Sequence, residues 1–95
     1  MPAYVIAQVD VFDPVRYEEY KKLAAPTVAA HGGRYLVRGG PVDVLEGKRD
    51  PGRVVVLDFP SVARAKEWWA SEEYERAKEI RHATATSEIV LIQGV

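Results

Sequence analysis

The sequence contains no cysteine, and this absence excludes disulfide bonds, thiolate metal ligands and a cysteine nucleophile. Histidine is scarce as well. His31 and His82 are the only two imidazoles, they lie far apart, and they form no metal-binding pattern with the scattered carboxylates. We therefore expect no metal and no cofactor, and we expect both histidines to lie at helix C-termini, where the helix dipole favours a partly charged ring.

An excess of charge of one sign is also missing. Thirteen Lys and Arg against fourteen Asp and Glu give a net charge of −1, whereas nucleic-acid or anionic-membrane partners would favour a clear basic excess. No apolar run approaches the roughly 20 residues of a membrane span. The first residues, Met1–Tyr4, lack the basic and apolar regions of a signal peptide, so we expect a cytoplasmic protein.

The chain is short. Its 95 residues, with a mass of 10.6 kDa, suffice for one domain, residues 1–95, and not for two independent cores. Hydrophobic residues make up 47% and charged residues 28%, which is the balance of a globular protein rather than a disordered one. A chain of this length buries only about 60–65% of its unfolded surface, so its stability should be marginal or shared with a partner.

The first third of the sequence predicts a strand followed by a helix. Residues 3–12 alternate so that one face is apolar and the other is mixed. Asp13-Pro14 is typical of an N-cap followed by proline at the first helical position. Apolar and aromatic residues at spacings of three and four continue the helix to His31. Pro26 predicts a kink or a break in it, and Gly32-Gly33 predicts a left-handed cap.

The rest of the chain predicts three further strands and a helix in two parts. Turn-forming Gly and Pro residues separate the strands, and serines at N-cap positions begin the helical parts. Consecutive valines predict that the third strand is buried on both faces. The expected elements are a strand formed by Arg34–Arg38 and Val42–Glu46 with a bulge or bend at Gly39–Pro41, a hairpin loop at Gly47–Gly52, the strand Arg53–Phe59, helices from Ser61 to about Ala70 and from Ser71 to about His82, and the strand Thr86–Gln93.

This β-α-β-β-α-β order predicts an α+β, ferredoxin-like fold with a four-stranded antiparallel sheet and the first and third strands in its centre. Both helical parts then cover the same face of the sheet, although the last two strands carry apolar side chains on both faces. The uncovered face measures roughly 400 Å², about the largest apolar patch of an ordinary monomer. We expect a homodimer that packs the helix-free sheet faces together. The alternative is a monomer whose second face is only lightly apolar, because Gln8, Asp10 and Asp58 lie there or nearby.

Several blocks of the sequence, in matching order and at matching separations, resemble one family over nearly the whole chain. These blocks are Met1–Tyr4, Asp13-Pro14 with Tyr17 and Tyr20, Gly32–Gly40, Val44–Gly47, Val54–Pro60, Trp68–Ser71 with Tyr74, and Ala85–Ser87. They are similar to the domain-of-unknown-function 1330 (DUF1330) family of small bacterial proteins. The resemblance implies a ferredoxin-like protomer in a dimeric α/β barrel. The wider barrel superfamily is similar in architecture to cofactor-independent monooxygenases, haem-degrading enzymes and muconolactone isomerases, and a shared fold does not transfer any of these activities.

Aromatic side chains are candidates for a ligand site. Tyr20 lies on the apolar stripe of the first helix, Trp68 near the end of the second, and Tyr74 at the start of its continuation. Each of them alone is more often a core residue. A cluster of such rings between helices and sheet, however, lines a pocket with a few polar tips, which is how small-ligand sites are built.

Two arginines complete the candidate pocket. Arg34, Leu36 and Arg38 share one face of an edge strand, where charges usually discourage the addition of further strands. Arg38, however, directly precedes a Gly-Gly pair, where a bulge can direct its guanidinium toward a planar anion. Arg81 follows Tyr74 by two helical turns and therefore shares its face. The expected occupant is a small organic anion.

Two functions from different classes fit these residues. The first is a dimeric barrel that binds or converts a small organic anion. If it is an enzyme, the resemblance favours cofactor-independent oxygenation or isomerisation, with Arg38 or Arg81 stabilising an enolate-like charge while a tyrosine relays protons. The second is a non-catalytic binding or interaction protein in which every residue named is structural. The sequence leaves both open, and an open or a collapsed pocket would distinguish them.

Overall fold

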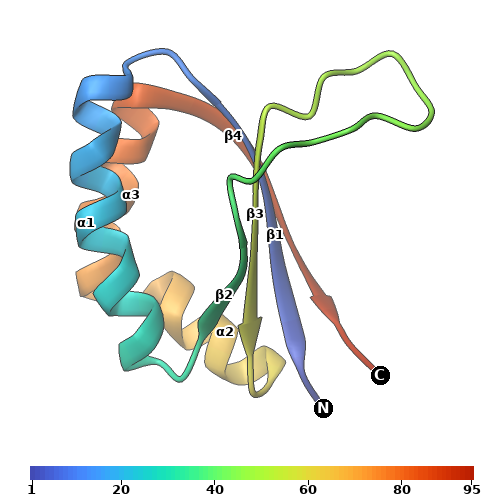
Figure 1. The fold of residues 1–95 in the computed structure, drawn as a ribbon. Helices are drawn as coiled ribbons and strands as arrows, with labels where there is room; N and C mark the ends of the chain where they lie inside the picture. The colour runs from blue at the N-terminus through green and yellow to red at the C-terminus, as the bar shows by residue number, and fades with distance from the viewer.

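Four antiparallel strands form one sheet in the order β2-β3-β1-β4 in the computed structural model, which describes all 95 residues. All three helices lie against one face of this sheet, and the other face is bare (Figure 1). The ferredoxin-like fold and the central position of the first and third strands are thereby confirmed. The elements are β1 (Ala3–Val11), α1 (Pro14–Ala30), β2 (Arg34–Arg38), β3 (Arg53–Phe59), α2 (Val62–Ala70), α3 (Glu72–Thr84) and β4 (Ala85–Gln93).

The predicted helix caps are present. The Asp13 carboxylate accepts the Arg16 backbone N–H at 3.2 Å, and Ser61 and Ser71 cap α2 and α3 in the same way. Gly32 ends α1 in the left-handed region with φ of +78°. None of the helices is both long enough and apolar enough to cross a membrane.

Two local predictions need correction. Of the two outcomes expected at Pro26, a break is wrong, because α1 runs from Pro14 to Ala30 without interruption; the proline lies on the exposed side, where water can solvate the carbonyl that loses its partner. Val42–Glu46 does not continue β2. Gly39, with φ of +72°, makes the last bond to β3, after which residues 40–52 leave the sheet as a loop that projects away from the helices (Figure 1).

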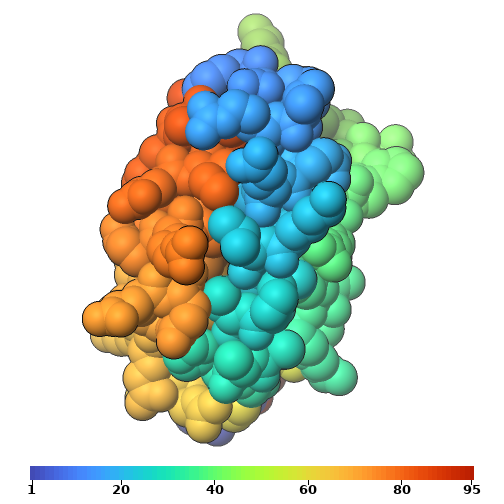
Figure 2. Space-filling view, turned by 90° about the vertical axis from the view of Figure 1, so that its left-hand side faces the viewer, coloured from blue at the N-terminus to red at the C-terminus, as the bar shows by residue number.

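The core lies between the helices and the covered face of the sheet. Alternate residues of β1 (Val5, Ala7 and Val9) are buried there, as the alternation predicts. Helices α1 and α3 lie side by side over them and close this side of the molecule (Figure 2). Trp68 of α2 is buried among the rings, whereas the adjacent Trp69 is 39% exposed. Neighbours on a helix point about 100° apart, so the two cannot share one environment.

A glycine at the end of α1 allows the first helix to approach the sheet. A Cβ atom added at Gly33 would lie 2.6 Å from the Phe59 ring and 2.9 Å from the side chain of Val28. Both neighbours are almost fully buried and have nowhere to move. Gly40, by contrast, has no atom within 4 Å of such a Cβ.

We therefore expect Gly33→Ala to lower the free energy of unfolding by about 1–3 kcal/mol, because an extra methyl group overpacks the core. Gly40→Ala is the matched control and should change it by less than about 0.5 kcal/mol. Urea denaturation of the two variants measures the difference. Equal midpoints for both would show that α1 does not depend on this close approach.

Candidate functional site

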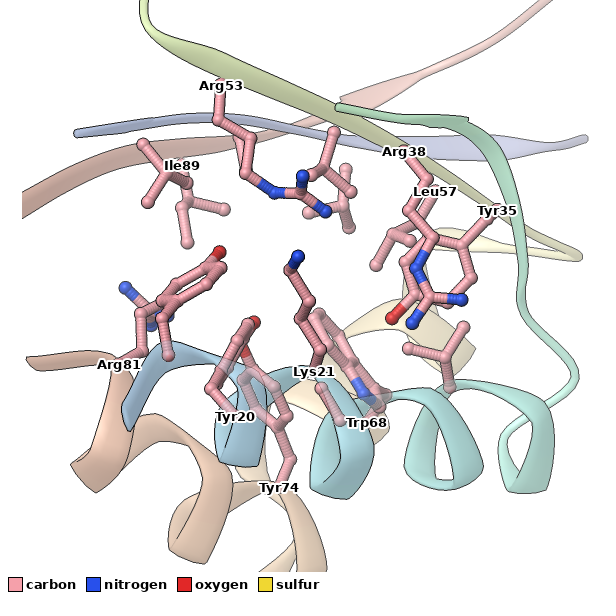
Figure 3. Close-up of a pocket in the computed structure, with 17 residues that line it drawn as sticks. Tyr20, Lys21, Tyr35, Arg38, Arg53, Leu57, Trp68, Tyr74, Arg81 and Ile89 are labelled. Atoms are coloured by element: carbon pink, nitrogen blue, oxygen red, sulfur yellow. The ribbon is translucent and has the colours of Figure 1, made fainter. Parts of the chain in front are cut away.

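A cavity lies between the helix layer and the covered face of the sheet (Figure 3). Its volume of about 30 Å³ has room for about two water molecules. Aliphatic side chains of the sheet form one wall. The cations that line the cavity are Lys21, Arg38, Arg53 and Arg81, and the rings are Tyr17, Tyr20, Tyr35, Trp68 and Tyr74. No carboxylate and no imidazole lines it, so the charge of the lining is positive.

Arg81 is a buried cation without an acidic partner. It lies in the last turn of α3 and is only 2% exposed. One of its amino nitrogens donates to the Ser87 hydroxyl of β4, while Nε and Nη2 are buried without a hydrogen-bond partner in the protein. These two nitrogens form one edge of the guanidinium, so a fork of parallel N–H donors is unused. A buried donor without a partner costs about 1–3 kcal/mol of stability. Groups held at such a cost are typical of functional sites rather than of structural cores.

Arg53 is a second arginine in the same cavity. It begins β3, its Nε is buried without a partner, and its guanidinium lies 5.9 Å from the centre of the Tyr17 ring. A Cβ atom at Gly39 would collide with this guanidinium. Glycine at position 39 thus serves two needs, because it adopts the left-handed turn and leaves space for Arg53.

A β-bulge brings Arg38 to the cavity. Arg34 pairs with Asp58, but the register shifts between Tyr35 and Val37, so that Arg38 pairs with Val55. The shift reverses the alternation, and the prediction that Arg34 and Arg38 share a face is wrong. Arg34 forms an ion pair with Asp58 at 3.0 Å, whereas Arg38 stacks 4.4 Å from the centre of the Tyr35 ring at the edge of the cavity.

Lys21 approaches the cavity from α1. Its side chain points toward Arg53 across the space between helix and sheet (Figure 3). Its ammonium also donates to the Glu18 carboxylate at 2.9 Å, at the exposed rim. The rim carboxylate therefore balances Lys21, and the two deeper guanidinium groups have no such partner.

The tyrosines of the cavity are neutral hydrogen-bonding groups. The hydroxyls of Tyr20 and Tyr74 lie 2.9 Å apart, and because one hydrogen bond uses one of two hydrogens, the pair retains a free O–H donor. Burial, and then the neighbouring Tyr74, raise the pKa of Tyr20 far above its ordinary value. Burial also raises the pKa values of Tyr17 and Tyr35, although the nearby Arg53 and Arg38 charges partly oppose it.

The structure brings together the five residues that the sequence singles out. Tyr20, Arg38, Trp68, Tyr74 and Arg81 all line this one cavity. The two histidines lie elsewhere. His31 is the C-cap of α1, with Nδ1 2.9 Å from the Thr27 carbonyl, and His82 is exposed in the last turn of α3. No group of three His, Asp or Glu side chains is placed to hold a metal ion.

Four charged or aromatic lining residues were not among the pocket candidates predicted from the sequence: Lys21, Arg53, Tyr17 and Tyr35. Arg53 carried a signal that could have been used. Side chains alternate between the two faces of a strand, so Arg53 lies on the same face as Val55 and Leu57. That face is the one covered by the helices. Tyr35 carried none, because the bulge that follows it could not be placed from the sequence.

Solved structures of other proteins share this fold at low sequence identity. A protein of unknown function from Rhodopseudomonas palustris has a TM-score of 0.82 at 20% identity, with 99% of this chain and 82% of that chain covered. SnoaB, a cofactor-independent oxygenase from Streptomyces nogalater, has a TM-score of 0.68 at 16% identity, over 99% and 93% of the two chains. A dimeric ferredoxin-like protein of unknown function from Jannaschia sp. CCS1 has a TM-score of 0.75 at 15% identity, over 99% and 100%.

No protein of curated function matches the sequence. A family described as a domain of unknown function, DUF1330, matches residues 2–95, which is essentially the entire chain. The ferredoxin-like protomer that this resemblance implied is the fold observed, with the cavity between its two layers. The protein is therefore a member of the DUF1330 family.

Proposed function

We propose that this protein binds a small organic anion with an aromatic or unsaturated body in the cavity between helices and sheet. One observation carries the proposal. The Arg81 guanidinium is buried with a free edge of two N–H donors in a lining that contains no acid. An anion with two oxygens would accept both hydrogen bonds from this edge, because guanidinium and carboxylate geometries match.

The remaining lining suits the body of such a ligand. Tyr20, Trp68 and Tyr74 offer ring faces and edges, and β1 and β3 offer aliphatic side chains. The volume of about 30 Å³ is smaller than any aromatic acid, so a ligand must displace side chains. Lys21 and Arg38 are suited to move, because both have long flexible stems and side chains that reach solvent.

The reaction class proposed is cofactor-independent oxygenation, with dioxygen as the oxidant, or isomerisation. Support comes from the likeness of fold to SnoaB, which is described as a cofactor-independent oxygenase, and from the positive lining, which stabilises an enolate-like charge. The free O–H of the Tyr20–Tyr74 pair would donate a hydrogen bond to this charge. The alternative is binding without catalysis, and the small volume of the unliganded cavity favours it.

We also propose that two copies pack through the helix-free face of the sheet, called here the outer face. Its apolar side chains are Tyr4, Ile6, Val54, Val56, Val90 and Ile92. Val90 and Ile92 are 57% and 54% exposed, although a strand normally buries such residues. The loop 40–52, whose Leu45 is 97% exposed, projects to the same side (Figure 1). The Jannaschia protein of the same fold is described as dimeric.

Replacing Val56 with lysine should separate the dimer, because it places a charge in the middle of the outer face, opposite Ile6. The mass measured by light scattering during size exclusion should fall from about twice the chain mass of 10.6 kDa to the chain mass itself. Val15→Lys on α1, where valine is 81% exposed, is the control and should leave the mass unchanged. A wild-type protein that elutes as a monomer at micromolar concentration would contradict this proposal.

Replacing Arg81 with methionine should weaken the binding of benzoate about tenfold to a hundredfold, because the charged hydrogen-bonded fork is lost. The unliganded variant should also melt at a higher temperature, because the substitution removes two buried donors that have no partner in the protein. The melting temperature should rise by roughly 4–8 °C for each kcal/mol by which the free energy of unfolding increases. Arg38→Ala should weaken binding while leaving the dimer intact. Calorimetry measures binding, and a thermal melt without ligand measures stability.

Two controls complete this experiment. Arg76→Met changes an exposed arginine of the same helix and should affect neither measurement. Benzamide has the shape of benzoate without its charge and should bind wild type weakly. If benzoate and benzamide bind equally, or if Arg81→Met binds benzoate as wild type does, the arginines have no role in binding.

A further inference from the structure

The cavity lining holds no group suited to remove a proton from a ligand at neutral pH. Neither a carboxylate nor an imidazole lines it, and the pKa values of Tyr17, Tyr20 and Tyr35 are raised, so these phenols stay protonated. The groups that face the cavity are, from α1, Tyr17, Tyr20 and Lys21 with Glu18 at the rim; from β2, Tyr35 and Arg38; from β3, Arg53; and from α3, Tyr74 and Arg81. Strands β1 and β4 and helix α2 contribute no charge to the lining.

Positive charge in the lining exceeds what one ionised ligand needs. The fork of Arg81 alone would satisfy a carboxylate, yet Arg53 faces the same cavity with its Nε buried and unpartnered. Glu18 is exposed and forms its ion pair with Lys21; its charge also acts on Arg53, but it makes no ion pair with Arg53 or Arg81. Cations within about 4–6 Å of a weak acid lower its pKa by roughly 1–3 units, and removal from water strengthens the effect of a charge.

We propose that the site takes up neutral weak acids of the 1,3-dicarbonyl class and holds them as enolates. This inference rests on the proposed function, since it concerns the same cavity. The enol O–H bond, or the C–H bond between the carbonyls, breaks and its proton passes to water. The electron pair remains on the ligand and spreads over two oxygens, which accept the Nε and Nη2 hydrogen bonds of Arg81. No base of the protein and no co-reactant is needed for this step.

The geometry suits an enolate with two oxygens. Arg81 presents two parallel donors, and the Tyr20–Tyr74 pair retains one free O–H hydrogen on the same side of the cavity, with the Arg81 guanidinium 5.9 Å from the centre of the Tyr20 ring. A neutral dicarbonyl offers weaker acceptors to the same donors, because hydrogen bonds to a charged group are roughly twice as strong. The site therefore favours the ionised form over the neutral one.

The test uses acetylacetone, a small 1,3-diketone that is largely neutral at pH 7.5. Calorimetry in two buffers of different ionisation enthalpy counts the protons released on binding to the full-length protein. We expect about one proton to be released per bound ligand. At pH values below the pKa of acetylacetone, the affinity should therefore rise about tenfold for each pH unit. The matched ligand 3,3-dimethylpentane-2,4-dione has no C–H bond between its carbonyls and does not ionise near neutral pH, and we expect it to release no proton and to bind at least tenfold more weakly.

Variants assign the effect to the guanidinium groups. Arg81→Met should abolish proton release, Arg53→Met should reduce the affinity for acetylacetone about tenfold, and Arg76→Met on the exposed side of α3 should behave as wild type. If benzoate binds but acetylacetone releases no proton, or if the dimethyl compound binds equally well, the enolate inference is wrong while the anion site stands. If neither benzoate nor acetylacetone binds, both proposals are wrong.

Discussion

The packing of one indole holds the helix layer on the sheet. Trp68 donates its N–H to the Thr27 hydroxyl of α1 at 3.0 Å. The centre of its ring lies 4.1 Å from the ring centre of Tyr74 and 5.3 Å from that of Phe59. A single side chain of α2 thus contacts α1, α3 and β3. Since a buried indole needs both apolar surroundings and an acceptor for its N–H, the three helices can satisfy it only in a narrow range of positions. This packing holds the helices at the distance from the sheet at which the cavity lies.

The uncompensated charge inside the cavity costs stability. A small domain has a free energy of unfolding of about 5–15 kcal/mol, so the unsatisfied donors of Arg53 and Arg81 are a considerable fraction of the whole. In a core selected only for stability, methionine or leucine would fill the same positions at lower cost. The two arginines are therefore explained by binding better than by folding.

The two faces of the sheet have different environments. The covered face supplies the cavity wall, and the outer face presents Val90 and Ile92 to solvent. The same strands contribute to both, because side chains alternate. A substitution that inverted the register of one strand would thus expose the cavity and disrupt the outer face together. The bulge at Leu36 exploits this alternation, since one extra residue moves Arg38 from one face to the other.

Local chemistry along the chain determined the elements, their caps and their order. Asp13, Ser61 and Ser71 begin helices because each accepts a nearby backbone N–H, and such signals need only a few neighbouring residues. Only the tertiary structure decided that residues 42–46 leave the sheet and that Arg38 faces the cavity, because a bulge depends on pairing with another strand. It likewise decided that Arg53 and Arg81 remain unpartnered. Whether an acid lies beside a buried cation is a property of distant segments brought together, and no spacing within one segment determines it.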